Sequence, residues 1–591
     1  MIRLLRDACL GGFLYGSLTY GTVLSAVHVL HNRLGSTRDA LLTYALFSLL
    51  YGLWAAAFFG AGALAARVSS RGADPDPDAR LRRAVWFGML AFDLLFWEVF
   101  FLYGLTYDQA PFHPGGAGGM VAVLAGLAVL IALVTGGLTW SLFRLLWGIR
   151  SRGRLALAVG LCGLLGFLAH AAAPVWSGSA PPPAKQPVPK IAVEDTGLKV
   201  LLVGLDGADW RVLRPMLAKG ELRAFAALMR DGASGDLATL PDSNSAVIWA
   251  SIYTGLTPER HGALDFYRIQ VPGMESRGLF PVHRTYFKEL ANVVAPLGLA
   301  RQLPVDRFSL ESPPIWEVAD RAGLSTGVVD GYFYSFPALA SARPESWFFS
   351  YGLDALAARG SSHPELFLQP KQLFRDVRPL LSGGDFHWQS KTLLKLLGER
   401  EQPRFVNFYT HEPDSAQHFF WKWYQPWYYL GIGDQEEAGK ADRIPAMQRD
   451  FDRFLAALLA RVGPETVVLV ASDHGHSPTL IHSLYTQHRH GPPGILLMRG
   501  GPVKPGLELS GSHVYDLYPT MLYLLGLPVP EDAAGRVLLD ALDPEFVRRH
   551  PVRTIPSYGP LGLAPGLPGA SRDGGMNALE IEKLKALGYI F

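Results

Sequence analysis

Cysteine is almost absent from this chain of 591 residues, which contains only Cys9 and Cys162. Both lie within long apolar stretches of the first 174 residues, so the rest of the chain cannot form a disulfide of its own. The stability of that larger part must therefore come from a hydrophobic core, which about 390 residues are enough to build.

Lysine is absent from residues 1–174, which carry 13 arginines and 8 acidic residues. This part has a net charge of +5, and because the whole chain has +2, the rest carries −3. A slightly acidic domain is a poor match for the phosphate backbone of a nucleic acid. We therefore expect no nucleic-acid partner.

Long apolar runs, in contrast, are abundant near the amino terminus. Five runs approach the ~20 residues needed to cross a bilayer, and they predict an all-α bundle of five transmembrane helices. The first run is not a cleaved signal peptide, because four more follow it. The runs are residues 9–30, 41–66, 84–106, 120–147 and 154–174.

Arginine is unevenly distributed among the loops between these runs. It precedes and follows the first run, is frequent after the second and the fourth, and is absent between the third and the fourth. By the positive-inside rule the amino terminus is cytoplasmic and everything after the fifth run lies outside. We expect a multi-pass protein of the cell (inner) membrane with a periplasmic or extracellular domain.

The third run contains two acidic residues, Asp93 and Glu98, near its middle. Charged groups at that depth are costly, and they normally face the interior of a helix bundle or a polar cavity. Two interpretations stay open. The residues form a functional polar site in the membrane domain, or they are packed and hydrogen-bonded to polar side chains of neighbouring spans.

Buried parallel strands are predicted where short apolar runs end in an acid. The run 199–205 is bounded by Lys199 and by Asp206, and the run 466–472 is followed by Asp473 and His474. The carboxyl ends of such strands meet at one edge of a sheet, where α/β folds place their ligands. A solvated turn is the alternative for any single strand-end acid.

Polar residues at other element boundaries extend this pattern. Ser245 begins an apolar helical stretch, where it is either a helix cap or part of an anion site at the helix amino terminus. Asp414 and His418 are four residues apart, which puts both on one face of a helix, as a metal pair requires. His488 and His490 precede a further apolar run.

These segments, taken in order, resemble a known family. VLLVGLDGADW, SAVIWASIYTGLTPERHG, DSAQHFFW, ASDHG and HGPPGILLMRGGP are similar to the type I phosphodiesterase and nucleotide pyrophosphatase branch of the alkaline phosphatase superfamily. The resemblance covers about residues 197–540. It implies an α/β fold, an alkaline-phosphatase-like core with a mostly parallel sheet between helices.

The resemblance also implies a catalytic site. Ser245 takes the position of the nucleophile, and two metal sites follow residue by residue. His490 fits the late histidine better than His488, and His476 is an additional imidazole nearby. One metal would be held by Asp206, Ser245, Asp473 and His474, and the other by Asp414, His418 and His490.

The residue types in this set suit metal-assisted phosphoryl transfer independently of the resemblance. Three carboxylates, three imidazoles and a serine alkoxide carry a charge that two divalent cations neutralise, and paired cations stabilise an in-line displacement at phosphorus. Mixed nitrogen and oxygen ligands favour zinc, with manganese or iron as alternatives. Metal coordination would activate the serine, which would form a covalent phospho-intermediate.

The chain is thus expected to comprise a membrane domain (1–174), a Pro-rich linker (175–196), a catalytic domain (197–540) and a tail (541–591). Insertions near the site are expected at about 268–304 and 334–400.

We expect a membrane-bound, metal-dependent phosphoric ester hydrolase acting outside the cytoplasm on phosphodiester or phospholipid-type substrates, with membrane lipids as partners. The alternative is a transferase of phosphoethanolamine or phosphoglycerol groups to a lipid or glycan. A catalytically inactive scaffold is the third reading.

Overall fold

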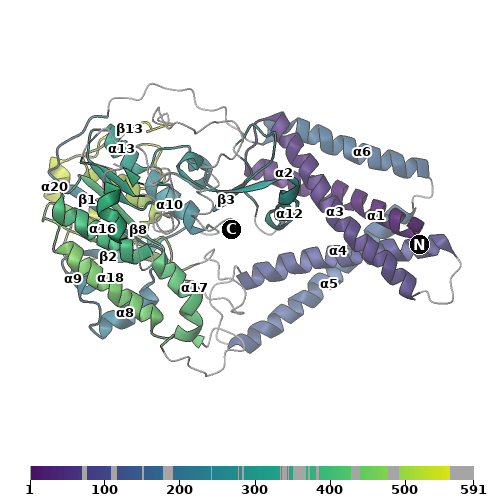
Figure 1. Ribbon diagram of the computed structural model, residues 1–591, viewed down its shortest axis with the longest axis horizontal. Helices are drawn as coiled ribbons and strands as arrows, with labels where there is room; N and C mark the ends of the chain where they lie inside the picture. The colour runs from purple at the N-terminus through teal and green to yellow at the C-terminus, as the bar shows by residue number, and fades with distance from the viewer. Residues whose placement is uncertain are drawn as a thin grey trace. The chain divides into compact units, whose positions relative to one another are not determined.

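The computed structural model (Figure 1) divides into two compact units. The helical unit contains the described residues among 2–107, 116–177 and 267–303, and the sheet unit contains those among 191–266 and 304–559. The structure describes residues 2–69, 76–107, 116–148, 152–177, 191–240, 243–276, 278–282, 285–332, 334–335, 343, 345–349, 368–369, 373–380, 385–426, 439–476 and 491–559.

Helices occupy all five apolar runs of the helical unit, but not all five qualify as spans. In the described part of the chain, two stretches are long and apolar enough to cross a membrane, Ile2–His31 and Thr37–Val68. The apolar stretches within α5 and α6 are shorter. The prediction of five spans is therefore reduced to two candidates. The helices are α1 (Ile2–Gly16), η1 (Ser17–Gly21), α2 (Thr22–His31), α3 (Thr37–Ser69), α4 (Pro77–Tyr107), α5 (Gly116–Gly148), α6 (Arg152–Ala171) and α7 (Ala173–Trp176).

Asp93 of α4 is buried at the centre of a hydroxyl network. Its carboxylate accepts hydrogen bonds from the hydroxyls of Tyr15 (2.8 Å), Tyr20 (2.8 Å) and Thr139 (2.7 Å). Tyr15 lies near the end of α1 and Tyr20 lies within η1, a π-helical turn, whose wider turn brings residues five apart towards one face. Asp93 thus adopts the hydrogen-bonded arrangement that the sequence left open, while Glu98 is half-buried farther along α4.

The chain segment 267–303, expected to be an insertion beside the catalytic site, belongs to the helical unit. It contains β3 (Tyr267–Gln270), α12 (Phe287–Val294) and η2 (Ala295–Leu297), and β3 pairs with β4 (Arg301–Pro304). The buried Asp39 carboxylate of α3 accepts the backbone N–H groups of Glu275 (2.7 Å) and Ser276 (2.8 Å). The Phe287 ring stacks on Phe47 of α3 with centroids 4.4 Å apart. This part of the chain is therefore packed against the helices.

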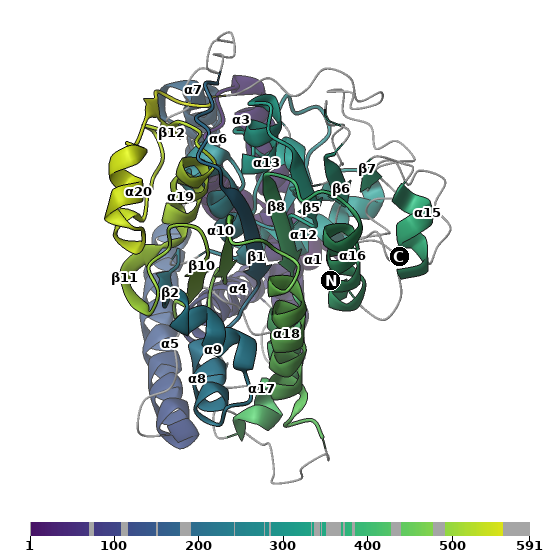
Figure 2. The same cartoon turned by 90° about the vertical axis from the view of Figure 1, so that its left-hand side faces the viewer.

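The sheet unit is built on a mostly parallel nine-stranded sheet (Figure 2). β1 lies at its centre and pairs in parallel with β8 and β9, while β10 runs antiparallel to β9 and β2. The fold class predicted for this part is confirmed. In spatial order the strands are β11 (Leu507–His513), β2 (Gly232–Ala238), β10 (Gly494–Arg499), β9 (Thr466–Ala471), β1 (Lys199–Leu205), β8 (Phe405–Thr410), β5 (Thr326–Val329), β6 (Trp347–Phe349) and β7 (Leu368–Gln369).

Helices cover both faces of this sheet, which explains why β1, β8 and β9 are continuous apolar runs. Leu201, Val203 and Leu205 of β1 join one core cluster with the helices that follow β1. On the other face, a Cβ added at Gly204 would lie 2.5 Å from the ring of Trp249. The principal helices are α8 (Trp210–Ala218), α9 (Arg223–Arg230), α10 (Ser245–Thr254), α13 (Ile315–Arg321), α16 (Asp385–Glu399), α17 (Glu412–Tyr424), α18 (Arg443–Leu459), α19 (Leu517–Leu524) and α20 (Pro544–Arg549).

Several expected boundaries differ in the structure. β6, β7 and α16 fall within the expected insertion at 334–400, and the two strands extend the main sheet. α20 and β13 (Thr554–Ile555) fall within the expected tail, and β13 pairs in parallel with β12 (Val529–Pro530). The linker residues 178–190 and the tail beyond 559 lie outside the described residues.

A buried carboxylate joins two helices of the sheet unit. Asp452 of α18 accepts three backbone hydrogen bonds from the first residues of α9, at Arg223 (3.1 Å), Ala224 (2.8 Å) and Phe225 (3.0 Å). These N–H groups have no partner within their own helix, so a charged acceptor from another helix satisfies them.

Asp452→Ala should lower the free energy of unfolding of the sheet unit by about 1–3 kcal/mol, because three backbone donors, two of them buried, lose their acceptor. Asp450→Ala on the same helix is the control, since Asp450 lies at the surface with a side-chain exposure of 46%. Urea unfolding and hydrogen exchange of the α9 amides measure both variants. Equal effects of the two substitutions would contradict the capping role.

Candidate active site

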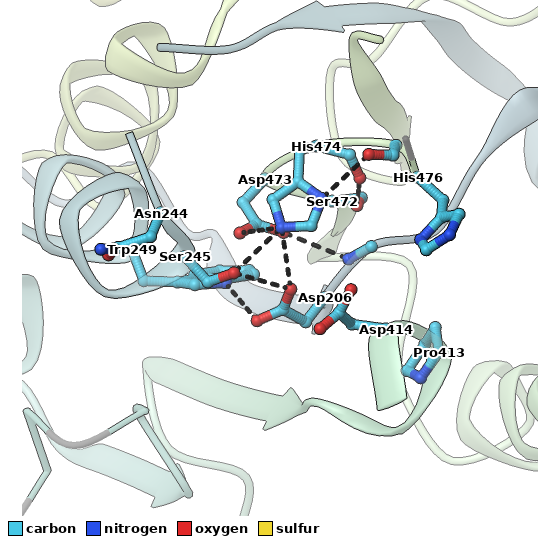
Figure 3. A network of polar contacts seen from close by, with 12 residues as sticks. Asp206, Asn244, Ser245, Trp249, Pro413, Asp414, Ser472, Asp473, His474 and His476 are labelled. Atoms are coloured by element: carbon cyan, nitrogen blue, oxygen red, sulfur yellow. Dashed lines mark hydrogen bonds and ion pairs between the residues drawn. The ribbon is translucent and has the colours of Figure 1, made fainter. Parts of the chain in front are cut away.

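Three parallel strands end side by side at one edge of the sheet. β1 lies between β8 and β9, with Leu205 opposite Thr410 and Gly204 opposite Ala471. The residues that follow these ends, among them Asp206 and Asp473, therefore converge (Figure 3). The strand-end pattern in the sequence and the position of the polar cluster agree for this reason.

Asp206 lies at the centre of the cluster and is 2% exposed. Its Oδ1 is 3.3 Å from the Ser245 hydroxyl oxygen and 3.4 Å from Nε2 of His474. Its Oδ2 accepts hydrogen bonds from the Tyr409 hydroxyl (2.6 Å) and the Trp249 indole N–H (3.1 Å). One carboxylate oxygen is thus fixed by the protein, and the other faces the remaining donors.

Ser245 is the first residue of α10, but it does not cap the helix. The capping side chain belongs to Asn244, whose oxygen accepts the Val247 N–H at 3.3 Å. The Ser245 hydroxyl is directed instead at Nε2 of His474, 2.9 Å away (Figure 3). The sequence left open whether Ser245 caps the helix or belongs to an anion site at its amino terminus. The geometry favours the second interpretation.

The tautomer of His474 follows from its neighbours. Its Nδ1 lies 3.1 Å from the carbonyl oxygen of Gly475, which can only accept, so Nδ1 carries the hydrogen. The lone pair on Nε2 then points to the Ser245 hydroxyl and lies 3.3 Å from Oδ2 of Asp473. An imidazole whose Nε2 faces a serine hydroxyl and carboxylate oxygens has an arrangement typical of a metal ligand.

Asp414 and His418 form a second pair on α17, with Oδ2 of Asp414 3.1 Å from Nε2 of His418. Gly207 connects this pair to the end of β1. It has φ +71°, and a Cβ there would lie 2.9 Å from Cα of Asp414, so a side chain would push the two strand ends apart. The Gln417 side chain also donates to the Gly207 carbonyl at 2.6 Å.

Burial and mutual repulsion dominate the electrostatics of the cluster. Burial, followed by the charges of Asp473 and Asp414, raises the pKa of Asp206 well above its ordinary value. Burial and Asp414 raise the pKa of Asp473 to about 7. At His418 burial acts to lower the pKa, but Asp414 outweighs it and the pKa is raised. Buried acids this close together favour either protonation or a bound cation.

The donor set fits a divalent metal ion. One ligand atom each from Asp206, Asp414 and His474 lie within 4.8 Å of one another. Oxygen and imidazole nitrogen donors from short, fixed side chains are suitable for zinc and for other transition metals.

The cluster, as far as the structure describes it, does not include the remaining predicted site residues. His488 and His490 fall outside the described residues. Asp93 and Glu98 belong to the helical unit and are not part of this cluster.

The sequence did not reveal the residues that position the ligands. Trp249 is four residues after Ser245 and therefore on the same face of α10, a spacing that could have identified it. Tyr409 lies within a continuous apolar strand, and no sequence signal distinguishes it from a core residue. Burial, and the neighbouring Asp206 charge, raise the pKa of Tyr409 well above its ordinary value, so its hydroxyl remains a donor.

The family model for type I phosphodiesterase / nucleotide pyrophosphatase matches residues 200–514. The chain belongs to this family. The matched range includes both strand-end acids, α10 and α17, so the polar cluster lies in the phosphodiesterase-family domain.

Curated relatives match shorter parts of that domain. A 2,3-bisphosphoglycerate-independent phosphoglycerate mutase of Cereibacter sphaeroides is 30% identical over 176 residues, 29% of this chain and 30% of the relative. A phosphopentomutase of Symbiobacterium thermophilum is 40% identical over 80 residues, 13% of this chain and 19% of the relative. The chain thus spans less than a third of the length of either relative.

Solved structures of similar proteins include human ectonucleotide pyrophosphatase / phosphodiesterase 5. It is 14% identical, with a TM-score of 0.37, over 58% of this chain and 99% of that chain. A phosphonate monoester hydrolase from Silicibacter pomeroyi is 16% identical, with a TM-score of 0.36, over 58% of this chain and 76% of that chain.

Tyr409→Phe should weaken metal binding by about 10–100-fold, because Oδ2 of Asp206 then keeps only the Trp249 donor and the carboxylate is less well oriented. Tyr523→Phe is the matched control, since its hydroxyl binds the backbone carbonyl of His550 in another part of the sheet unit. Competition with a chelator of known affinity measures both. The positioning role of Tyr409 is excluded if both variants bind zinc as tightly as the wild type.

Proposed function

We propose that this protein is a metal-dependent phosphodiesterase that acts through a covalent phosphoserine at Ser245. The observation that carries the proposal is the hydroxyl of Ser245. It is released from helix capping by Asn244 and lies 2.9 Å from Nε2 of His474 and 3.3 Å from Oδ1 of Asp206. A nucleophile within hydrogen-bond reach of a base, among metal ligands, is the arrangement that phosphoryl transfer requires.

Two groups of residues would hold divalent cations, of which zinc fits the donors best. Asp206, Ser245, Asp473 and His474 form the first group, and Asp414 and His418 belong to the second. The family resemblance adds His490 to the second. When bound, such cations neutralise the buried acids and stabilise the charge on the attacking and leaving oxygens.

The protein's own residues account for the remaining steps. Oγ of Ser245 attacks phosphorus, and the leaving oxygen departs with the electron pair of the broken P–O bond. The Ser245 hydroxyl would lose its proton to solvent before the attack, because the neighbouring Oδ1 of Asp206 and Nε2 of His474 would be occupied as metal ligands. Water then attacks the phosphoserine, the P–O bond to Ser245 breaks with its electron pair on Oγ, and Oγ takes up a proton released by the attacking water. The positive end of the α10 helix dipole favours a phosphate beside Ser245.

Ser245→Ala should lower the turnover of an aryl phosphodiester by about 10³-fold or more, with the zinc content measured alongside. Ser245→Thr is the matched control, because it keeps a hydroxyl at the same position and should retain part of the activity. Rapid acid quenching of the wild type with labelled substrate should trap phosphoserine. Near-normal turnover by Ser245→Ala would refute the nucleophile assignment.

Transfer to an alcohol is the second candidate function. Relatives of this chain include enzymes named as mutases, and a phosphoserine can be attacked by an alcohol in place of water. Phosphoethanolamine or phosphoglycerol transfer to a lipid or glycan is the form expected from the sequence. Partition of the trapped phosphoserine between water and an added alcohol or lipid acceptor distinguishes transfer from hydrolysis.

We further infer that the helical unit is a multi-pass membrane domain with a cytoplasmic amino terminus. Two candidate spans, helices in all five apolar runs and the distribution of arginine support this topology. A phospholipid-type substrate outside the cytoplasm would be consistent with it.

A reporter that is active only outside the cytoplasm tests this topology. Fused after Pro181 it should be active, and fused after Asp76 it should be silent, because five crossings would separate the amino terminus from the sheet unit. Immunoblots of both fusions control for expression. The reverse pattern would mean that the topology is inverted. Activity of both fusions would mean that both fusion points lie on the same, outer side of the membrane, which contradicts the proposed topology.

A further inference from the structure

His476 is a buried imidazole next to the second group of metal-binding residues. Its ring centroid lies 5.8 Å from that of His418, with the ring planes 88° apart. On another side it lies 4.5 Å from the ring of Trp421. Figure 3 shows the His476 ring on the same side of the cluster as Asp414, with Ser245 on the opposite side.

The separation of the two rings matches a shared cation. With a Zn–N bond of about 2.1 Å, the centroid of each coordinating imidazole lies about 3.2 Å from the ion. Two imidazoles on one ion, at angles from tetrahedral to somewhat wider, then have centroids about 5–6 Å apart. His418 and His476 meet this condition, and Asp414 is already 3.1 Å from His418.

The backbone of His476 is held in place by residues that follow β1. Its N–H donates to Oδ2 of Asp209 at 2.9 Å, and its carbonyl accepts from Arg211. Arg211 also pairs with Asp209 at 2.6 Å and lies over the Trp421 ring at 5.3 Å. This network fixes the position from which the imidazole projects.

Gly475 allows this close approach. A Cβ at that position would lie 2.7 Å from Oδ2 of Asp209, so a side chain would displace the carboxylate that holds His476. The sequence Asp473-His474-Gly475-His476 therefore places one histidine toward Ser245 and the other toward His418.

We propose that His476 is a direct ligand of the second cation, together with Asp414 and His418. This assignment rests on the proposed two-metal function, and it adds a ligand that the family resemblance does not supply. One carboxylate and two imidazoles are a frequent protein ligand set for zinc, and His476 would complete such a set from the described residues alone, without His490.

Metal titration of the full-length protein in detergent tests the assignment. Wild type should bind two cobalt(II) or zinc ions, and His476→Ala should bind the second at least about 100-fold more weakly, with a changed cobalt d–d absorption band. His476→Phe should show the same loss, because it retains the packing against Trp421 but has no donor nitrogen. His387→Ala, at an exposed position of α16, controls for the removal of a histidine.

The possible results separate a ligand from a packing residue. If His476→Phe binds both ions with wild-type affinity and spectrum, the imidazole only packs and the assignment is overturned. Near-ultraviolet circular dichroism and the melting temperature of each variant identify losses that come from misfolding, and His476→Gln provides a smaller change of shape for that case. Retention of both ions by His476→Gln would likewise overturn the assignment.

Failure of this inference is distinguishable from failure of the proposed function. If His476→Ala keeps both ions while Ser245→Ala abolishes turnover, the phosphodiesterase proposal stands and only the ligand assignment is wrong. A wild-type protein that binds no more than one ion would overturn the two-metal function and this assignment with it.

Discussion

The repulsion between buried carboxylates is the constraint on which the arrangement of the sheet unit depends. Asp206 and Asp473 are each at most 2% exposed, and Asp414 adds a third negative charge. Burying such groups together is costly unless cations or hydrogen-bond donors compensate. The protein supplies donors from Tyr409, Trp249 and the Gly207 backbone, and leaves the inward oxygens to other partners. The uncompensated negative charge of the cluster is therefore typical of a metal-binding site rather than of a polar cluster that only stabilises the fold.

Glycine makes this density of charge possible. Gly207 lets the end of β1 approach Asp414, and Gly475 lets the loop after β9 approach Asp209. Both sites of close approach join segments that are far apart in the sequence, so the cluster is fixed by the parallel order of β9, β1 and β8. A buried acid of the helical unit also depends on an unusual backbone geometry. The π-helical turn η1 brings the hydroxyls of two tyrosines to the Asp93 carboxylate.

The path of the chain links the two units in an unexpected way. Residues 267–303 leave the sheet unit shortly after α10, the helix that begins with Ser245, and pack against α2 and α3 before the chain returns. The contacts are specific, since the Asp39 carboxylate and the Asn32 side chain bind backbone groups of this segment. An insertion expected to shape the substrate site is thus, in its described part, a component of the helical unit.

The sequence by itself determined the buried parallel strands, the acids at their ends and the amphipathic spacing of Asp414 and His418, because these depend on local periodicity. It also located the apolar runs that form helices, of which two in the described part of the chain are long and apolar enough to be candidate spans. Only the tertiary structure decided that Asn244 caps α10, that Tyr409 and Trp249 hold Asp206, and that His476 lies beside His418. The Asn244 cap is a local contact, but the other relations join residues that are adjacent only after the sheet has formed, and a strand tyrosine or a buried histidine carries no local signal of its partner.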